Sequence, residues 1–480
     1  MFFLENGVPY ISKAAAECIP ELYSEFAKPV FPPSTDPLRD WTDWRTGGYW
    51  DEDTLSAPFI RRDDKHTEER VRQGFRDGSM KQHVDGVNAL QRVPWTINTR
   101  VLAALEWWAP LAPRLKRGSA SLVQFGEKLI AEETLAADLQ QAKDLGGDVF
   151  RIPHSCDARG RAYGISHFNF ARSDHVRASR KKPRKTRKAA AVNRRDLVVR
   201  KKVVVLTPEE ALREWWLARG LTRSIVKRPA MTYAYSATLS GMGAEVAKHL
   251  KELGCNDWRT DRERADYLAK LIMAACKDVL VRPTEIMKYL RKLAAYRAKL
   301  NQPFEWTTPT GFPWSSTYFE QKHKSVDLWR YGERFSHQNV VVGETRKVWK
   351  AKLLNAAAPN FVHAMDACHL MRVTNAAVEE GITSIVGVHD CFGCLATRAS
   401  RFHRIIRAQF ALLYMQYVYT LIPEEKAGVE LGRQVKHRGV LASLRAAALG
   451  PAAADEARLP IPPAGSLNIY KVQNSEYPFA

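Results

Sequence analysis

Residues 223–236 read RSIVKRPAMTYAYS, in which four chemically distinct side chains are spaced four residues apart. Arg223, Lys227, Met231 and Tyr235 would form one stripe along a helix, since residues four apart lie on the same helix face. Two cations one turn apart suit a polyphosphate, and a tyrosine two turns further on could reach a sugar or a base. A solvated basic helix face explains the same spacing, and the residues alone leave both interpretations open.

Two neighbours modify this helix prediction. Arg228 falls on the face next to the stripe, where it could also meet an anion. Pro229 weakens a helix unless it lies in the first turn or at a kink, because proline removes a backbone donor and clashes with the preceding turn.

A second motif, VGVHDCFG at residues 386–393, predicts a short strand followed by a tight turn. Asp390 would lie at the tip of this hairpin, where a carboxylate can hold a divalent metal ion. The alternative is a turn aspartate that accepts hydrogen bonds from nearby backbone N–H groups.

Two further segments carry polar side chains in regular patterns. DARGRAY at residues 157–163 places Arg159 and Arg161 around a glycine, which suits close approach to a phosphate backbone; the alternative is a surface turn with an Asp–Arg pair. His363, Asp366 and His369 recur every three residues and predict a half-buried polar helix face that lines a cleft, in preference to a metal site.

The charge balance points to a polyanionic partner. The 480 residues include 73 Lys and Arg against 52 Asp and Glu, a formal net charge of +21. Such an excess most often marks a nucleic-acid-binding protein, although a basic protein without such a partner is the alternative. Fourteen of these cations lie between Arg172 and Lys202, a segment we expect to be disordered because it cannot pack into a core.

Composition excludes several other classes of protein. Hydrophobic residues make up 45% of the chain, which is ordinary for a globular protein and argues against a disordered or collagen-like one. Seven cysteines in a chain of this length do not suggest a disulfide framework. The longest strongly apolar stretch, at 411–422, is too short to cross a bilayer, and the N-terminus resembles neither a signal nor a transit peptide. We therefore expect a cytoplasmic protein with no membrane segment.

Hydrophobic periodicity predicts a mixed α/β chain. We expect irregular structure over 1–95, helices over 96–146, 208–300, 360–380 and 400–422, strands over 149–170 and from 303, a hairpin over 385–395, and a loop over 442–465.

Taken in order, these segments resemble the single-subunit DNA-dependent RNA polymerases of bacteriophages and mitochondria. DARGRAY, RSIVKRPAMTYAY, APNFVHAMDACHL and VHDCFG are similar to four of the family's motifs, and TTPTGFPW is similar to the strand that enters its promoter-specificity hairpin. The likeness runs from about Gly47 to Ala480. Met231 favours an RNA polymerase, because the related DNA polymerases carry an aromatic residue at this position.

The resemblance implies a right-hand polymerase fold with a palm sheet, helical fingers and a thumb. The domains would be an N-terminal remnant (1–95), thumb-like helices (96–146), the first part of the palm (147–171), the basic segment (172–207), fingers with a specificity-hairpin-like region (208–350, the latter 303–350), and the second part of the palm with the C-terminal foot (351–480).

The resemblance also implies a chemistry and its partners. The family transfers nucleotides with two Mg²⁺ ions held by palm carboxylates, and uses a DNA template, ribonucleoside triphosphates and an RNA product, as a monomer. The residues implied are Asp390 for metal and catalysis, Lys227 and Tyr235 for catalysis, Arg223, Arg228, His363 and Arg161 for substrate, and Arg159 and Arg161 for DNA. Lys227 and Arg223 would hold the triphosphate, and Tyr235 and His363 would lie near its sugar.

Three departures alter this expectation. The family's other palm carboxylate, in a D-G-S/T-C-x-G-x-Q-like segment, is not found; Asp174 and Asp196 lie in the interval without that pattern. Ser236 stands where the family has glycine, and most of the promoter-melting domain is not matched. We therefore expect an incomplete palm sheet and greatly reduced or no polymerase activity. The alternative function is a catalytically inactive, nucleic-acid-binding remnant.

Overall fold

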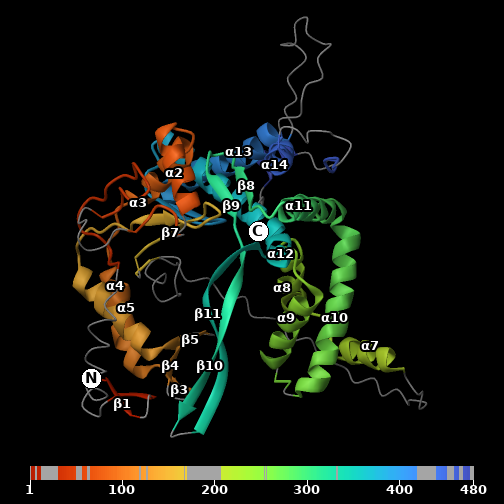
Figure 1. Cartoon of the computed structure of the whole chain (residues 1–480). Helices are drawn as coiled ribbons and strands as arrows, with labels where there is room; N and C mark the ends of the chain where they lie inside the picture. The colour runs from red at the N-terminus through yellow and green to blue at the C-terminus, as the bar shows by residue number, and fades with distance from the viewer. Residues whose placement is uncertain are drawn as a thin grey trace, which may run out of the picture.

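The computed structural model describes residues 2–5, 8–11, 31–49, 57–61, 65–117, 120–125, 128–166, 168–169, 207–252, 254–255, 257–330, 333–418, 439–450, 459–463 and 469–475. The basic segment, for which we expected disorder, lies outside these residues, as do Asp174 and Asp196. Helices and short strands together make a mixed α/β chain, as predicted (Figure 1).

A long central helix, α12 (Lys350–Glu379), organises the molecule. It packs against three other helices, which are α3 (Lys81–Gln91), α11 (Val281–Lys299) and α13 (Ala399–Val418). Ala357, Ala364 and Ala367 are buried on α12, and such small side chains let neighbouring helices approach closely. The helix begins ten residues earlier than the sequence pattern predicted, and Pro359 lies inside it.

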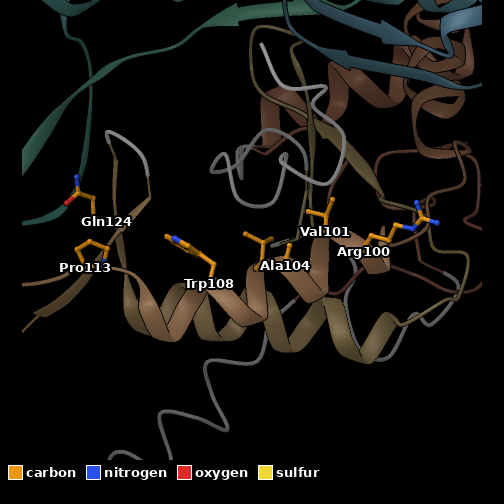
Figure 2. Close-up of a pocket in the computed structure, with 7 residues that line it drawn as sticks. Arg100, Val101, Ala104, Trp108, Pro113 and Gln124 are labelled. Atoms are coloured by element: carbon orange, nitrogen blue, oxygen red, sulfur yellow. The ribbon is translucent and has the colours of Figure 1, made fainter. Parts of the chain in front are cut away.

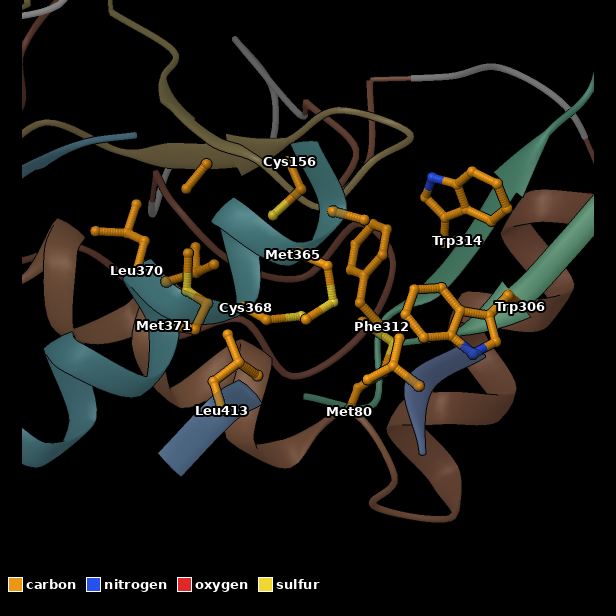
Figure 3. Packing of buried hydrophobic residues seen from close by; sticks show 14 of the residues in the cluster. Met80, Cys156, Trp306, Phe312, Trp314, Met365, Cys368, Leu370, Met371 and Leu413 are labelled. Atoms are coloured by element: carbon orange, nitrogen blue, oxygen red, sulfur yellow. The ribbon is translucent and has the colours of Figure 1, made fainter. Parts of the chain in front are cut away.

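The main hydrophobic core surrounds α12 (Figure 3). Met365, Cys368 and Met371 on this helix share the core with Phe312 and Trp314, which come from a hairpin of β8 (Phe304–Thr307) and β9 (Pro313–Ser316) and its connecting loop. Burial of large apolar side chains is the dominant favourable term in folding. The core therefore fixes the position of α12 and of the polar face that α12 presents.

Two short hairpins lie on this core, and each forms its own two-stranded antiparallel sheet. The first joins β6 (His154–Cys156) to β7 (Ala162–Gly164), and the second joins β12 (Ile385–Val388) to β13 (Cys391–Cys394). Both hairpins were predicted, as parts of one palm sheet that we expected to be incomplete. They do not share one, because no described strand bridges the narrow crevice between β7 and β12.

A second hydrophobic core holds the helices that precede α11 among those predicted between residues 208 and 300. Figure 1 shows the arrangement of these helices. A capping box between Thr207 and Glu210 starts the first of them, since the two side chains satisfy each other's backbone N–H groups. The helices before α11 are α7 (Pro208–Arg219), α8 (Arg223–Tyr233), α9 (Leu239–Glu252) and α10 (Trp258–Val279).

The region expected to hold thumb-like helices contains a small sheet as well. Helices α4 (Thr99–Trp108) and α5 (Glu132–Leu145) were predicted, but residues 122–125 and 128–131 form strands where we expected helix. Alternating apolar residues there fit a strand as well as a helix, and the pairing partner decides between them. The strands are β3 (Arg114–Arg117), β4 (Ala120–Phe125) and β5 (Lys128–Ala131).

Two other predictions of irregular structure were wrong in part. Residues 65–91 form α2 (Lys65–Arg76) and α3, and the predicted loop over 442–465 begins with helix α14 (Val440–Leu449). Tertiary packing explains both, because Val71 and Val84 in the first case and Leu444 in the second are buried in the main core. Strands β1 (Phe2–Glu5) and β2 (Val8–Ile11) pair near the N-terminus.

A long two-stranded ribbon leaves the body of the molecule (Figure 1). It consists of β10 (Phe319–Arg330) and β11 (Glu333–Val348), paired antiparallel with three irregularities in register.

Short 3₁₀ turns occur at Ala109–Leu111, Ala396–Arg398 and Ile469–Asn474. Among the described residues, no helix combines the length and the low polarity needed to cross a membrane.

Gly311 provides a test of how tightly the β8–β9 loop is packed. A Cβ at Gly311 would lie 1.6 Å from the carbonyl oxygen of Ser79, and its φ of +82° is unfavourable for other residues. We expect Gly311→Ala to lower the free energy of unfolding by about 3 kcal/mol or more. Gly381, with φ +77° and open space around it, is the matched control. Its alanine variant should lose only about 1 kcal/mol, and equal losses in urea unfolding would contradict the packing argument.

Candidate functional site

The stripe predicted on α8 lies on the outside of the second core. Ile225, Pro229 and Tyr233 are buried on one side of the helix, which leaves the opposite side to solvent. Met231 is 54% exposed and Tyr235 is 36% exposed, so neither is tucked into the core. Arg223, Lys227 and Met231 therefore form an exposed stripe along α8, but the helix ends at Tyr233, so Tyr235 lies in the turn that follows and not on the predicted stripe.

The cations of α8 differ in their surroundings. Arg228 lies 3.9 Å from Glu245 on α9, which makes a loose ion pair. Arg223 and Lys227 are exposed and form no hydrogen bond or ion pair within the described part of the chain. These two are the cations left to meet an anion.

Tyr235, in the turn that follows α8, contacts the central helix α12. Its ring lies 5.3 Å from the ring of His363 on α12, between centroids. His363 Nδ1 in turn lies 2.7 Å from Nη1 of Arg159. A guanidinium only donates hydrogen bonds, so Nδ1 accepts and the ring proton of neutral His363 resides on Nε2. Burial, helped by Arg161 and Arg159, lowers the pKa of His363 to about 4.

Asp157 organises the turn between β6 and β7. Its Oδ1 accepts hydrogen bonds from the backbone N–H groups of Arg159 and Arg161, at 2.8 and 3.1 Å. Its Oδ2 accepts from Nε of Arg159 at 2.8 Å and from the hydroxyl of Tyr163 at 3.3 Å. The Asp–Arg pair that we gave as the alternative interpretation is thus present, and this carboxylate is fully engaged.

Arg161 is engaged as well. Its Nη2 lies 2.6 Å from Oδ2 of Asp366 on α12, and both side chains are mostly buried. Burial raises the pKa of Asp366, an effect that Arg161 opposes and the nearby charge of Asp390 reinforces. His363 and Asp366 therefore share the polar face predicted for α12. His369 does not, because its Nε2 lies 3.0 Å from the carbonyl oxygen of Ile406 on α13.

The β12–β13 turn presents Asp390 next to this cluster. His389 adopts φ +56° in the two-residue turn, and its ring lies 4.8 Å from that of Tyr163. Asp390 is exposed, and no hydrogen bond or ion pair of its side chain occurs within the described residues. The carboxylate is thus free, and the capping alternative does not hold.

The described residues do not fit a site for two Mg²⁺ ions. No group of three His, Cys, Asp or Glu side chains among them is placed to hold a metal ion. Both oxygens of Asp157 accept hydrogen bonds and Oδ2 of Asp366 is paired with Arg161, which leaves Asp390 as the carboxylate of this cluster without an ion pair among the described residues. A single carboxylate is a poor ligand set for a pair of divalent cations.

An apolar groove lies apart from these residues (Figure 2). It has a volume of about 570 Å³ and lies between α4 and the β3–β4 hairpin. Trp108 and Ala104 point into it, with Arg100 at one end and Gln124 at the other. The groove carries no pair of groups suited to acid–base or metal chemistry.

Sequence reasoning brought most of the cluster together but missed several partners. Tyr163 and Asp366 were visible in motifs and received no role. His83, which lies beneath the Asp157 turn, gave no signal, because its partners are distant in sequence.

Comparison with known proteins identifies the family. The family model for DNA-dependent RNA polymerase matches residues 184–440, which is more than half of the chain. The chain therefore belongs to the DNA-dependent RNA polymerase family.

Curated relatives include enzymes from plant organelles and from a phage. The DNA-directed RNA polymerase 2 (chloroplastic/mitochondrial) of Arabidopsis thaliana is 30% identical over 210 residues, covering 43% of this chain and 20% of the relative. The DNA-directed RNA polymerase of Enterobacteria phage T3 is 30% identical over 221 residues, covering 42% and 25%. The matches thus span about a fifth to a quarter of these relatives' lengths.

The backbone conformation of Ser236 shows why the family pattern has glycine at this position, and it provides a test. It follows Tyr235 with φ +60°, and its buried hydroxyl has no hydrogen-bond partner among the described residues. Glycine adopts such a φ without strain. We expect Ser236→Gly to raise the free energy of unfolding by about 1 kcal/mol. Ser240, in α9, is the control; if Ser240→Gly stabilises the protein as much in urea unfolding, the strain argument fails.

The buried histidines predict acid sensitivity. Burial lowers the pKa values of His83 and His154 from 6.5 to about 4, so each stays neutral in the folded protein while the unfolded chain binds protons. Stability should fall as the pH drops from 6.5 toward 4. Between pH 7.5 and pH 5, each imidazole should remove about 2 kcal/mol from the free energy of unfolding. Urea unfolding of His83→Gln should show a weaker pH dependence than wild type; an unchanged slope would exclude His83 as a cause.

Proposed function

We propose that this protein is a DNA-directed RNA polymerase, and that the described cluster is its nucleotide site. The DNA template, the RNA product and the ribonucleoside triphosphates are its partners, and the protein acts as a monomer in the cytoplasm of a bacterial host. The net charge of +21 supports polyanionic partners, whose binding should weaken steeply with salt.

One observation carries the proposal: four sequence motifs meet in a continuous chain of side-chain contacts. Tyr235 contacts His363, His363 bonds to Arg159, and Tyr163 links Arg159 to His389 beside Asp390. A set of polar groups that converges in this way is the expected form of a binding or catalytic site.

Each residue then has a role that follows from its surroundings. Arg223 and Lys227 are exposed cations without partners in the described part of the chain, so they are available to hold a triphosphate. Tyr235 contacts His363, whose Nε2–H is left as a donor. These two groups would meet the sugar of a nucleotide whose phosphates are held by the cations of α8. Arg159 and Arg161 hold the turn and α12 together, and any contact with DNA would be made by the parts of them that remain accessible.

The metal requirement sets a condition on activity. Asp390 would be one carboxylate of the site, and the described residues supply no second free carboxylate beside it. The proposal therefore requires a further carboxylate from residues outside those described, and we expect slow RNA synthesis by this chain.

The proposal is tested with nucleotide binding and primer extension. Lys227→Ala should weaken ATP binding about tenfold, because a charge-assisted contact is lost, and Lys248→Ala on α9 is the matched exposed control. With Mg²⁺, a primed DNA template and four ribonucleotides, wild type should extend the primer and Asp390→Asn should not. Equal ATP affinity of the two lysine variants, or extension by Asp390→Asn, would contradict the assigned roles.

A second candidate function is nucleic-acid binding without nucleotidyl transfer. The engaged state of Asp157 and Asp366 favours it, because one free carboxylate cannot hold two ions well. The same assay separates the two functions: tight, salt-sensitive binding of the primed template with no extension would support this second function.

A further inference from the structure

His83 lies directly beneath the turn that carries Arg159 and Arg161. It is fully buried on α3, and its Nε2 lies 3.0 Å from the carbonyl oxygen of Gly160. Its Nδ1 lies 2.9 Å from Oγ1 of Thr310, in the loop between β8 and β9. Three elements distant in sequence thus meet at one imidazole.

The hydrogen-bonding groups fix the orientation of this ring. A carbonyl oxygen only accepts, so Nε2 of His83 carries the proton and donates to Gly160. Nδ1 then accepts from the hydroxyl of Thr310, which also lies 3.3 Å from Sγ of Cys368 on α12. Burial lowers the pKa of His83 to about 4, so the ring keeps a single proton at neutral pH.

The turn rests on the ring without spare space. Gly160 has φ +87°, and a Cβ there would lie 3.1 Å from both His83 and Phe312. The neighbours of Gly160 in the chain are Arg159, which bonds to His363, and Arg161, which bonds to Asp366. A shift of this one peptide would therefore move both contacts between the turn and α12.

We propose that His83, oriented by Thr310, is a positioning residue that sets ribose selection at the nucleotide site. It acts by holding the Gly160 carbonyl, which fixes Arg159 and, through Arg159, the His363–Tyr235 pair. The inference rests on the proposed function, because it takes His363 and Tyr235 as the residues beside the sugar.

A role in packing alone does not explain the choice of side chain. A buried polar group costs free energy unless it is hydrogen-bonded, and an apolar side chain would fill the space without that cost. It would also remove the donor to the Gly160 carbonyl, whose desolvation would then be uncompensated. The imidazole is the group here that can donate to one element and accept from another.

The test uses variants that differ in hydrogen bonding more than in volume. Thr310→Val removes the hydroxyl that orients His83, and His83→Leu removes the donor. His83→Gln keeps an amide donor and is the conservative rescue. Thr374→Val is the matched control, because Thr374 is equally buried on α12 and its hydroxyl donates to the carbonyl of Leu370, away from the turn.

The first measurement is amide hydrogen exchange, which needs no nucleotide. The N–H of Gly160 donates to the carbonyl of Asp157, and the N–H of Arg161 donates to its carboxylate. We expect exchange across residues 157–163 to become about tenfold faster in Thr310→Val and His83→Leu. Thr374→Val and His83→Gln should stay close to wild type. Unchanged exchange in Thr310→Val and His83→Leu would overturn the inference.

The second measurement is the ratio of the dissociation constants for dATP and ATP. A general loss of stability would weaken both nucleotides alike, so the ratio reports positioning. We expect it to fall toward one in Thr310→Val and His83→Leu and to be retained in His83→Gln and Thr374→Val. Faster exchange with an unchanged ratio would overturn the inference while leaving the proposed function intact. Absence of ATP binding by wild type would overturn both.

Discussion

The site depends on the hydrogen bonds that the guanidinium of Arg159 makes. It bonds to Asp157 within its own turn and to His363 on α12, and so joins a short hairpin to the longest helix. The hairpin has only three residues in each strand, and such a small sheet is marginal by itself. Its position comes from these polar contacts and from the core below, in which Cys156 and Ala162 are buried.

Arg159 and its neighbour Arg161 together explain why two carboxylates of the cluster are paired rather than free for metal ions. Asp157 and Asp366 each neutralise an arginine in a partly buried setting, where an unpaired charge would be costly. The partners of each ion pair therefore neutralise each other's charges beside the exposed carboxylate of Asp390, whereas Arg223 and Lys227 are exposed cations on α8.

Much of this arrangement could be predicted from sequence where the signal is local. The α8 stripe and the Asp390 hairpin depend on spacings of four and two residues; the hairpin occurs as expected, and the helix holds Arg223, Lys227 and Met231 but ends before Tyr235. The strands β3, β4 and β5 were missed because their apolar residues fit two periodicities. The contact of His83 with Thr310 spans 227 residues, and no local pattern encodes it. The separate sheets of β6–β7 and β12–β13 likewise depend on which strands meet in three dimensions.

The β10–β11 ribbon has a mechanical consequence. Its first strand has 12 residues, and at about 3.4 Å per residue it extends roughly 40 Å. Within the described residues it is a sheet of two strands only, so its stiffness comes from one ladder of hydrogen bonds. Because the ribbon is attached at one end, a tilt of a few degrees at Phe319 displaces the backbone at its far end by several ångströms. Small changes in the angle at which the ribbon leaves the body are thus amplified along its length.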